Sequence, residues 1–117
     1  MSYGKLFFTF ALTKNNTNMI IQFGNINNSL GTRSLGSKLR LEIEENLKKG
    51  EFVSFDFSNV DVVSHSFADE CFGKLLLKWE IEELKKTTTF TNVNPFVKKI
   101  ISFTLKERQH KLELASN

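Results

Sequence analysis

The sequence predicts a single α/β domain with a mixed β-sheet and helices mainly on one face. Its 117 residues include one proline and no long linker, so the whole chain, 1–117, suits one domain. Strand-like segments alternate with helical segments in the second half, which implies parallel crossovers. Hydrophobic residues make up 40% of the chain, and its twelve phenylalanines have no polar group, so most should lie in a core. The expected order of elements is ββαβαβα.

Two strands in the segment 1–23 are expected to form an N-terminal β-hairpin. The first shows a period of two in its apolar residues, which are Leu6, Phe8, Phe10 and Leu12. The second runs from Met19 to Phe23. An Asn-rich link between them tolerates the positive φ angles of a tight turn.

The first helix is predicted over residues 34–50, after a loop rich in Gly, Asn and Ser. Its apolar stripe recurs every four residues, at Leu35, Leu39, Ile43 and Leu47. Gly50 is the expected stop. The next segment, 52–57, is almost continuously apolar, which is typical of a central strand covered on both faces.

A second helix is predicted from Phe67 to Lys86, with Cys71 and Trp79 on its inner face as core residues. The Thr-rich segment 87–93 favours a strand. A third helix should begin after Asn94, which can cap it, with Pro95 at the first helical position. The tail, 109–117, is expected to be a frayed extension.

Composition narrows the functional class. The single cysteine excludes an intrachain disulfide and fits a cytoplasmic location. The apolar start of the chain is short and has no small-residue cleavage site, and no run reaches the ~18 apolar residues of a membrane helix, so we expect no signal peptide and no membrane partner. Two distant histidines and one cysteine do not favour a metal, and we expect no cofactor. A net charge of +3 alone does not favour nucleic acid.

Ser64, His65 and Ser66 form the most conspicuous polar group. Catalysis is disfavoured because adjacent residues rarely point at one another as nucleophile and base do, and no Gly-x-Ser-x-Gly turn is present. The structural interpretation makes Ser66 a helix N-cap, with Asp69 placed like the acidic member of a capping box. A phosphorylation or docking role stays open, since it is compatible with a cap.

Arg33 lies between Thr32 and Ser34 in the segment "GTRSLG". This segment lacks the Gly-Lys-Ser/Thr ending of a nucleotide-binding loop. The Arg33 guanidinium could bind a phosphate or carboxylate of a partner, or it could pair within the chain, with Asp56 or Asp61 as the expected acids.

The segment "FDFSNVDVVSHSFADECFGKL" resembles the STAS domain of sulfate transporters and anti-sigma factor antagonists, with Asp56, Phe57 and Ser58 at the matching strand end. "GTRSLG" (31–36) and "SHSFADE" (64–70) resemble more closely a STAS-like family of uncharacterised function, often found alone or beside histidine-kinase-type ATPase domains. The resemblance covers roughly residues 24–108.

This resemblance implies a bacterial, non-enzymatic regulatory module that works by partner switching. It would dock through the start of the second helix, at Ser64, His65, Ser66 and Asp69, onto a protein such as a histidine-kinase-type ATPase or an anti-sigma-like protein. Aligned on Asp56, His65 takes the position of the family's phosphorylated serine. The alternative is a small nucleic-acid-associated factor or inhibitor encoded by a mobile element, based on mild positive charge, small size and many asparagines. Steep salt dependence of binding would distinguish it.

Overall fold

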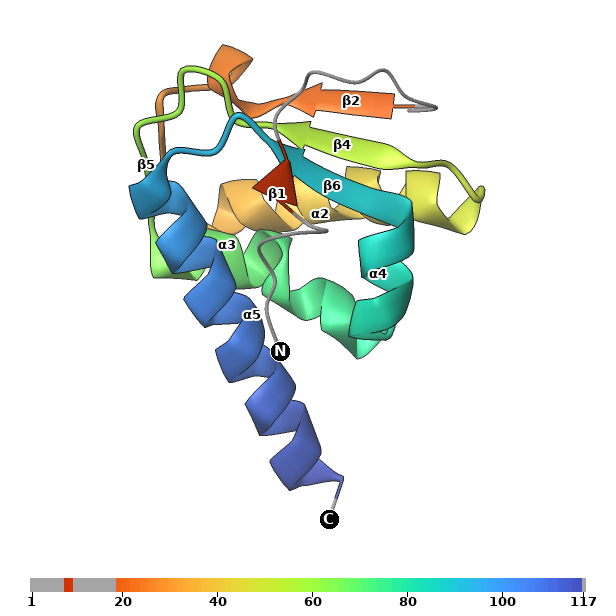
Figure 1. The fold of residues 1–117 in the computed structure, drawn as a ribbon. Helices are drawn as coiled ribbons and strands as arrows, with labels where there is room; N and C mark the ends of the chain where they lie inside the picture. The colour runs from red at the N-terminus through yellow and green to blue at the C-terminus, as the bar shows by residue number, and fades with distance from the viewer. Residues whose placement is uncertain (1–7, 10–18, 117) are drawn as a thin grey trace.

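The computed structural model describes residues 8–9 and 19–116 and forms an α/β domain around a four-stranded sheet (Figure 1). The strand order is β1-β6-β4-β2, and every pair among the described strands is parallel, so the expected mixed sheet is wrong for this part of the chain. The strands are β1 (Phe8–Thr9), β2 (Met19–Gln22), β4 (Val53–Asp56) and β6 (Thr88–Thr91). A second, two-stranded parallel sheet pairs β3 (Ser29–Leu30) with β5 (Val62–Val63).

The predicted N-terminal hairpin is wrong, because β1 and β2 lie at opposite edges of the sheet. Phe8 of β1 is opposite Phe90 of β6, and Ile21 of β2 is opposite Phe55 of β4. The rest of the predicted hairpin, 1–7 and 10–18, lies outside the described residues. A period of two indicates a strand with one buried face, but it carries no information about the direction or identity of the neighbouring strand.

Within the described residues, four α-helices and two 3₁₀ turns accompany the strands, and Figure 1 shows α2, α3 and α4 together below the sheet. They are η1 (Phe23–Asn25), α2 (Arg33–Lys48), α3 (His65–Cys71), η2 (Gly73–Leu77), α4 (Ile81–Thr87) and α5 (Pro95–Ala115).

The single helix expected over 67–86 is broken into α3, η2 and α4. The chain tightens at Gly73, where an added Cβ would lie 2.6 Å from the Asp69 carboxylate, so the backbone there packs directly against that group. A new helix then starts at Glu80, whose backbone N–H donates to the Glu83 carboxylate at 2.9 Å in a capping box.

The first and third predicted helices are confirmed. Gly50 follows α2 with a φ of 81°, as a C-terminal stop requires. The Asn94 side chain accepts from the Val97 N–H at 2.7 Å, and Pro95 is the first residue of α5. The frayed tail is wrong over 109–115, because α5 continues to Ala115 and its last turns project beyond the other elements (Figure 1). Lys, Glu, Leu and Ala in this stretch are strong helix formers.

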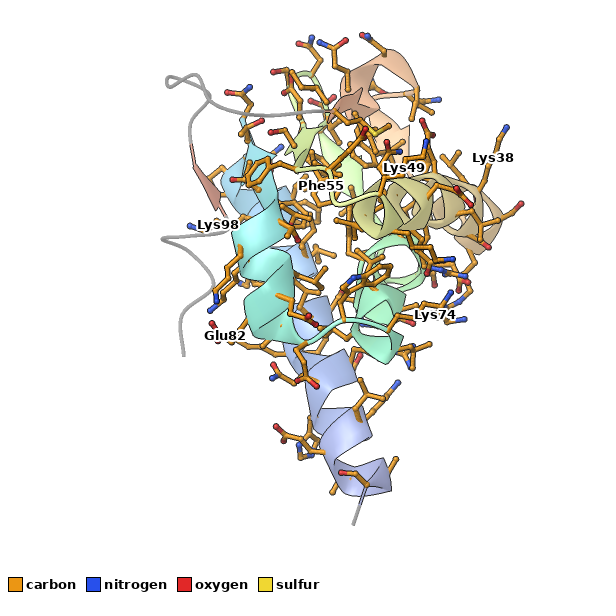
Figure 2. All side chains as sticks on the ribbon, turned by 90° about the vertical axis from the view of Figure 1, so that its right-hand side faces the viewer. Lys38, Lys49, Phe55, Lys74, Glu82 and Lys98 are labelled. Atoms are coloured by element: carbon orange, nitrogen blue, oxygen red, sulfur yellow. The ribbon has the colours of Figure 1, made fainter. Side chains whose placement is uncertain are left out.

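The core is built from phenylalanine, as the composition predicts. Six rings are at most 2% exposed: Phe23, Phe55, Phe57, Phe67, Phe72 and Phe90. Phe72 lies 5.0 Å from both Phe55 and Phe90, ring centre to ring centre, so α3 and the sheet are joined through aromatic contacts. Figure 2 shows Phe55 in the interior between the strands and the helices. Cys71 is fully buried as expected, and Trp79 packs half-buried against the core. No helix among the described residues has the length and apolar character needed to cross a membrane.

Candidate functional site

The starts of α2 and α3 lie side by side because the parallel strands β3 and β5 lead into them. The Ser64 backbone N–H donates to the Leu30 carbonyl at 2.9 Å, and the Ser64 hydroxyl donates to the Gly31 carbonyl at 2.8 Å. These bonds hold the segment before α2 against the segment before α3. We call residues 32–34 and 64–66 together the helix-start surface.

Both helices are capped by hydroxyl side chains. Thr32 Oγ1 accepts from the Leu35 N–H at 3.1 Å, and Ser64 Oγ accepts from the Phe67 N–H at 2.9 Å. The predicted cap at Ser66 is therefore wrong: β5 keeps the backbone extended only as far as Ser64, and α3 begins at His65. Ser66 lies half-buried in the first turn.

Asp69 does not act as the acidic member of a capping box, because it is 6% exposed and faces two arginines. Arg108 of α5 donates to both of its oxygens, with Nη2 at 2.7 Å from Oδ2 and Nε at 3.1 Å from Oδ1. Arg33 Nη1 lies 3.2 Å from Oδ2. The carboxylate therefore joins α3 to both α2 and α5.

Glu70 extends this arrangement on the next position of α3. Its carboxylate lies 3.0 Å from Arg33 Nη1, 3.1 Å from Arg40 Nη1 and 3.2 Å from Lys74 Nζ, and Arg40 also donates to its carbonyl. Arg33 thus forms an intramolecular pair, but with Asp69 and Glu70 and not with Asp56 or Asp61. The α3 ion-pair network consists of Arg33, Arg40, Glu44, Asp69, Glu70, Lys74, Lys78 and Arg108.

The network keeps both acids ionised. Burial acts to raise the pKa of Asp69, but the hydrogen bonds and charges of Arg108 and Arg33 outweigh it, so this pKa is lowered. Burial likewise opposes ionisation of Glu70, and hydrogen bonds from Arg40 and Lys74 lower its pKa. A carboxylate stabilised in this way is a weak proton acceptor, so the arrangement favours a structural role for both acids over acid–base chemistry.

His65 is the accessible member of the helix-start surface that faces α5. Its Nε2 lies 2.8 Å from Glu107 Oε1, its ring centre lies 5.7 Å from that of Phe103, and its side chain is 41% exposed. On the other side of this surface, the Arg33 side chain is 52% exposed and Ser34 is exposed. The surface therefore presents an imidazole, a guanidinium and hydroxyl groups over a buried charged layer.

Asp56 has a local role at the end of β4. Its Oδ1 accepts from the Ser58 N–H at 2.9 Å, from the Ser58 hydroxyl at 2.8 Å and from Asn92 Nδ2 at 3.0 Å. Burial opposes ionisation, yet the bonds from Asn92 and Ser58 lower the pKa of this acid. Asp56 thus fixes the turn after β4 to the end of β6.

A groove of about 230 Å³ lies elsewhere, between the η2–α4 link and α5. It is lined by residues that include Trp79, Ile81 and Gln109, and by none of the helix-start surface. Among the described residues, no group of three or more His, Cys, Asp or Glu side chains is placed to hold a metal ion.

The two sequence motifs meet in one helix–helix contact. Arg33 of "GTRSLG" binds Asp69 of "SHSFADE", and Gly36 packs so closely that an added Cβ would lie 2.9 Å from the Phe67 carbonyl oxygen. Sequence reasoning missed Arg40 and Arg108 as partners of these acids. The spacing of four residues between Glu70 and Lys74 could have indicated part of the network, but the long-range contact of Arg108 has no local signal.

Comparison with known proteins identifies one family. A model described as "STAS-like domain of unknown function (DUF4325)" matches residues 36–98, which is 63 of the 117 residues and more than half of the chain. The match includes all of α3 and begins at Gly36, so Arg33 and Arg108 lie outside it. Neither a curated protein nor a solved structure matches the chain. The chain therefore belongs to the family of STAS-like domains of unknown function.

Proposed function

We propose that this protein is a non-enzymatic regulatory module that docks onto a protein partner through the helix-start surface. The observation that carries the proposal is the contact between the two motifs. It puts His65 and Arg33 at one solvent-exposed junction while the acids beneath them are neutralised within the chain.

A rigid surface of this kind suits recognition, because little conformational freedom is lost when a partner binds. The hydroxyl caps and the α3 ion-pair network fix both helix starts. Arg33 contacts Asp69 and Glu70 through Nη1, and Nη2 has no hydrogen-bond partner among the described residues. That nitrogen can donate hydrogen bonds to a carboxylate of the partner, which favours a partner with an acidic segment.

Switching would act through Ser66. The hydroxyl of Ser64 already caps α3 and donates to Gly31, so modifying it would disrupt the fold. A phosphate on Ser66 would instead add about −1.5 to −2 charges beside His65 at the start of α3. It would compete with an acidic partner for the same positive groups and lower its affinity.

The test is affinity capture from the native host, followed by calorimetry with the purified partner. Baits are the wild type, His65→Glu and Ser66→Ala, with Lys38→Glu as a matched charge control, since Lys38 is exposed on α2 outside the surface (Figure 2). We expect the Lys38 variant to retain the partner and His65→Glu to weaken its binding at least about tenfold, because the new carboxylate would repel an acidic partner. Mass spectrometry of the wild-type bait reads out phosphate on Ser66.

Identical partners and affinities for all baits would contradict docking at this surface. Capture of nucleic acid alone, released by moderate salt, would support the nucleic-acid-associated class instead.

A further inference from the structure

A stripe of residues runs along α5 beside its core-facing side; four of its members are exposed, and Ile100 is partly buried against the core. Residues alternately four and three positions apart form it, which is the spacing of a helix–helix seam. Its members are Phe96, Ile100, Phe103, Glu107, His110 and Leu114. Phe96 is 52%, Phe103 56% and Leu114 60% exposed, and these are three of the most exposed large apolar side chains among the described residues.

The described body of the domain covers one flank of this stripe. Buried residues Val97, Ile101 and Leu105 face inward, and His65 of α3 lies against Phe103. The residues of the opposite flank are exposed to solvent in the part of the chain that the structure describes, and the last turns of α5 project past the other elements (Figure 1). This open flank carries Lys99, Lys106 and Glu113, all exposed.

We propose that the occupant of this stripe is the α5 helix of a second copy of the chain, packed antiparallel to form a two-fold dimer. Turned end to end, the stripe brings its two apolar ends together. Phe96 and Leu114 both lie nine positions from Leu105, so each apolar end meets the other end of the second copy. Phe103 and Glu107 both lie two positions from Leu105, so the two Phe103 rings lie near the middle of the seam, each beside Glu107 of the other copy.

Charges on the open flank select the same arrangement. The midpoint of Lys99 and Glu113 is position 106, one residue from the centre of the seam, so antiparallel pairing brings Lys99 near Glu113 of the second copy. The two-fold axis makes this pair twice. Lys106, which has a contact within its own chain, and Glu107, which binds His65, are the like-charge groups near the axis. In a parallel pairing, the open flank of one α5 helix would have to contact the other flank of the second α5 helix. That other flank is covered by α3, so the body of the domain obstructs a parallel pairing.

Glu107 is compatible with a place inside the seam, because it is already hydrogen-bonded to His65. His65 also belongs to the helix-start surface, so the proposed dimer interface and the proposed docking surface are adjacent at this residue. The dimer does not depend on the proposed function: self-association can hold when docking fails, and docking can hold when self-association fails.

The test is sedimentation equilibrium of the purified full chain over a wide concentration range. We expect the wild type to approach twice the monomer mass with a dissociation constant in the micromolar range, since one helix pair is a small interface. Phe103→Glu should weaken the dimer at least about a hundredfold, because two buried rings are lost together. Leu41→Glu is the matched control: Leu41 is 58% exposed on α2, and this variant should leave the equilibrium unchanged.

The register is tested by charge exchange. Lys99→Glu alone should weaken the dimer about tenfold, because two attractive pairs become repulsive. The double variant Lys99→Glu with Glu113→Lys should return to within about twofold of the wild type. A wild type that stays monomeric at the highest concentration would overturn the proposal and leave the stripe to a different protein's helix. A dimer that Phe103→Glu does not weaken, or a double variant no tighter than the single one, would overturn it equally.

Discussion

Replacing Asp69 with Asn tests whether the α3 ion-pair network holds the helices together. The side chain is 9% exposed, and its oxygens accept three hydrogen bonds from Arg108 and one from Arg33. Asparagine keeps the shape but is neutral, and its amide group turns two donors toward the guanidinium groups. Removing one partner of a buried pair costs about 3–5 kcal/mol. Arg108 is 17% exposed and regains some hydration, so we expect a loss of about 2–4 kcal/mol in the free energy of unfolding.

The assay is urea unfolding at neutral pH. Asp61→Asn is the matched control: Asp61 is exposed, and the same change there should stay within about 0.5 kcal/mol of the wild type. A double-mutant cycle with Arg108→Gln should give a coupling energy above about 1 kcal/mol, because the two side chains are in direct contact. An Asp69→Asn variant that matches the control would refute the structural role of the network.

Three further predictions concern the same junction. Gly36→Ala should lower the free energy of unfolding by about 1–3 kcal/mol, because its Cβ would press α2 against the backbone of α3, while Gly31→Ala, with nothing within 4 Å, should not. Equal denaturation midpoints for the two variants would contradict this. Ser64→Ala should cost about 1 kcal/mol or more through loss of the α3 cap, and Ser66→Ala should cost less; thermal melts that rank them oppositely would argue against the capping assignment. The two buried acids of α3 have pKa values below their ordinary 3.8 and 4.5, so the unfolded state takes up protons first. The stability that these two acids contribute is complete above about pH 5 and is lost as the pH falls through their lowered pKa values. Measuring the free energy of unfolding as a function of acid pH should show this loss. If Asp69→Asn had the same dependence of unfolding free energy on pH as the wild type, the prediction would be wrong.

Local patterns predict the elements whose stability is local. The four-residue stripe of α2 and its stop at Gly50, the apolar segment at β4, and the cap of α5 at Asn94 all agree with the structure. In each case the deciding interaction lies within one turn or one strand, so the sequence contains it.

Properties that depend on distant contacts could not be predicted. The apolar alternation of the first strands says nothing about their parallel partners β6 and β4. The apolar residues over 67–86 keep a helical spacing even though the helix is interrupted before and after η2. They do so because the residues after Gly73 still bury apolar side chains against α5 and the core. The sequence pattern therefore does not reveal the interruptions.

The two predicted segments lie next to each other, but the contacts of their side chains differ from those expected. Ser64, His65 and Arg33 do lie together, yet Asp69 is buried beneath them. An acid on the edge of an apolar helix face is ambiguous in sequence, since only the fold shows that Arg108 arrives from α5 to neutralise it. This is why a segment expected to expose an acidic residue exposes an imidazole and a guanidinium instead.

The most direct test of the docking proposal is hydrogen–deuterium exchange of the protein with and without its purified partner. Docking at the helix-start surface should slow exchange at residues 31–35 and 62–68, which form the backbone of that surface and its flanks. Protection confined to the strands or to the η2–α4 link, with both helix starts unchanged, would contradict it.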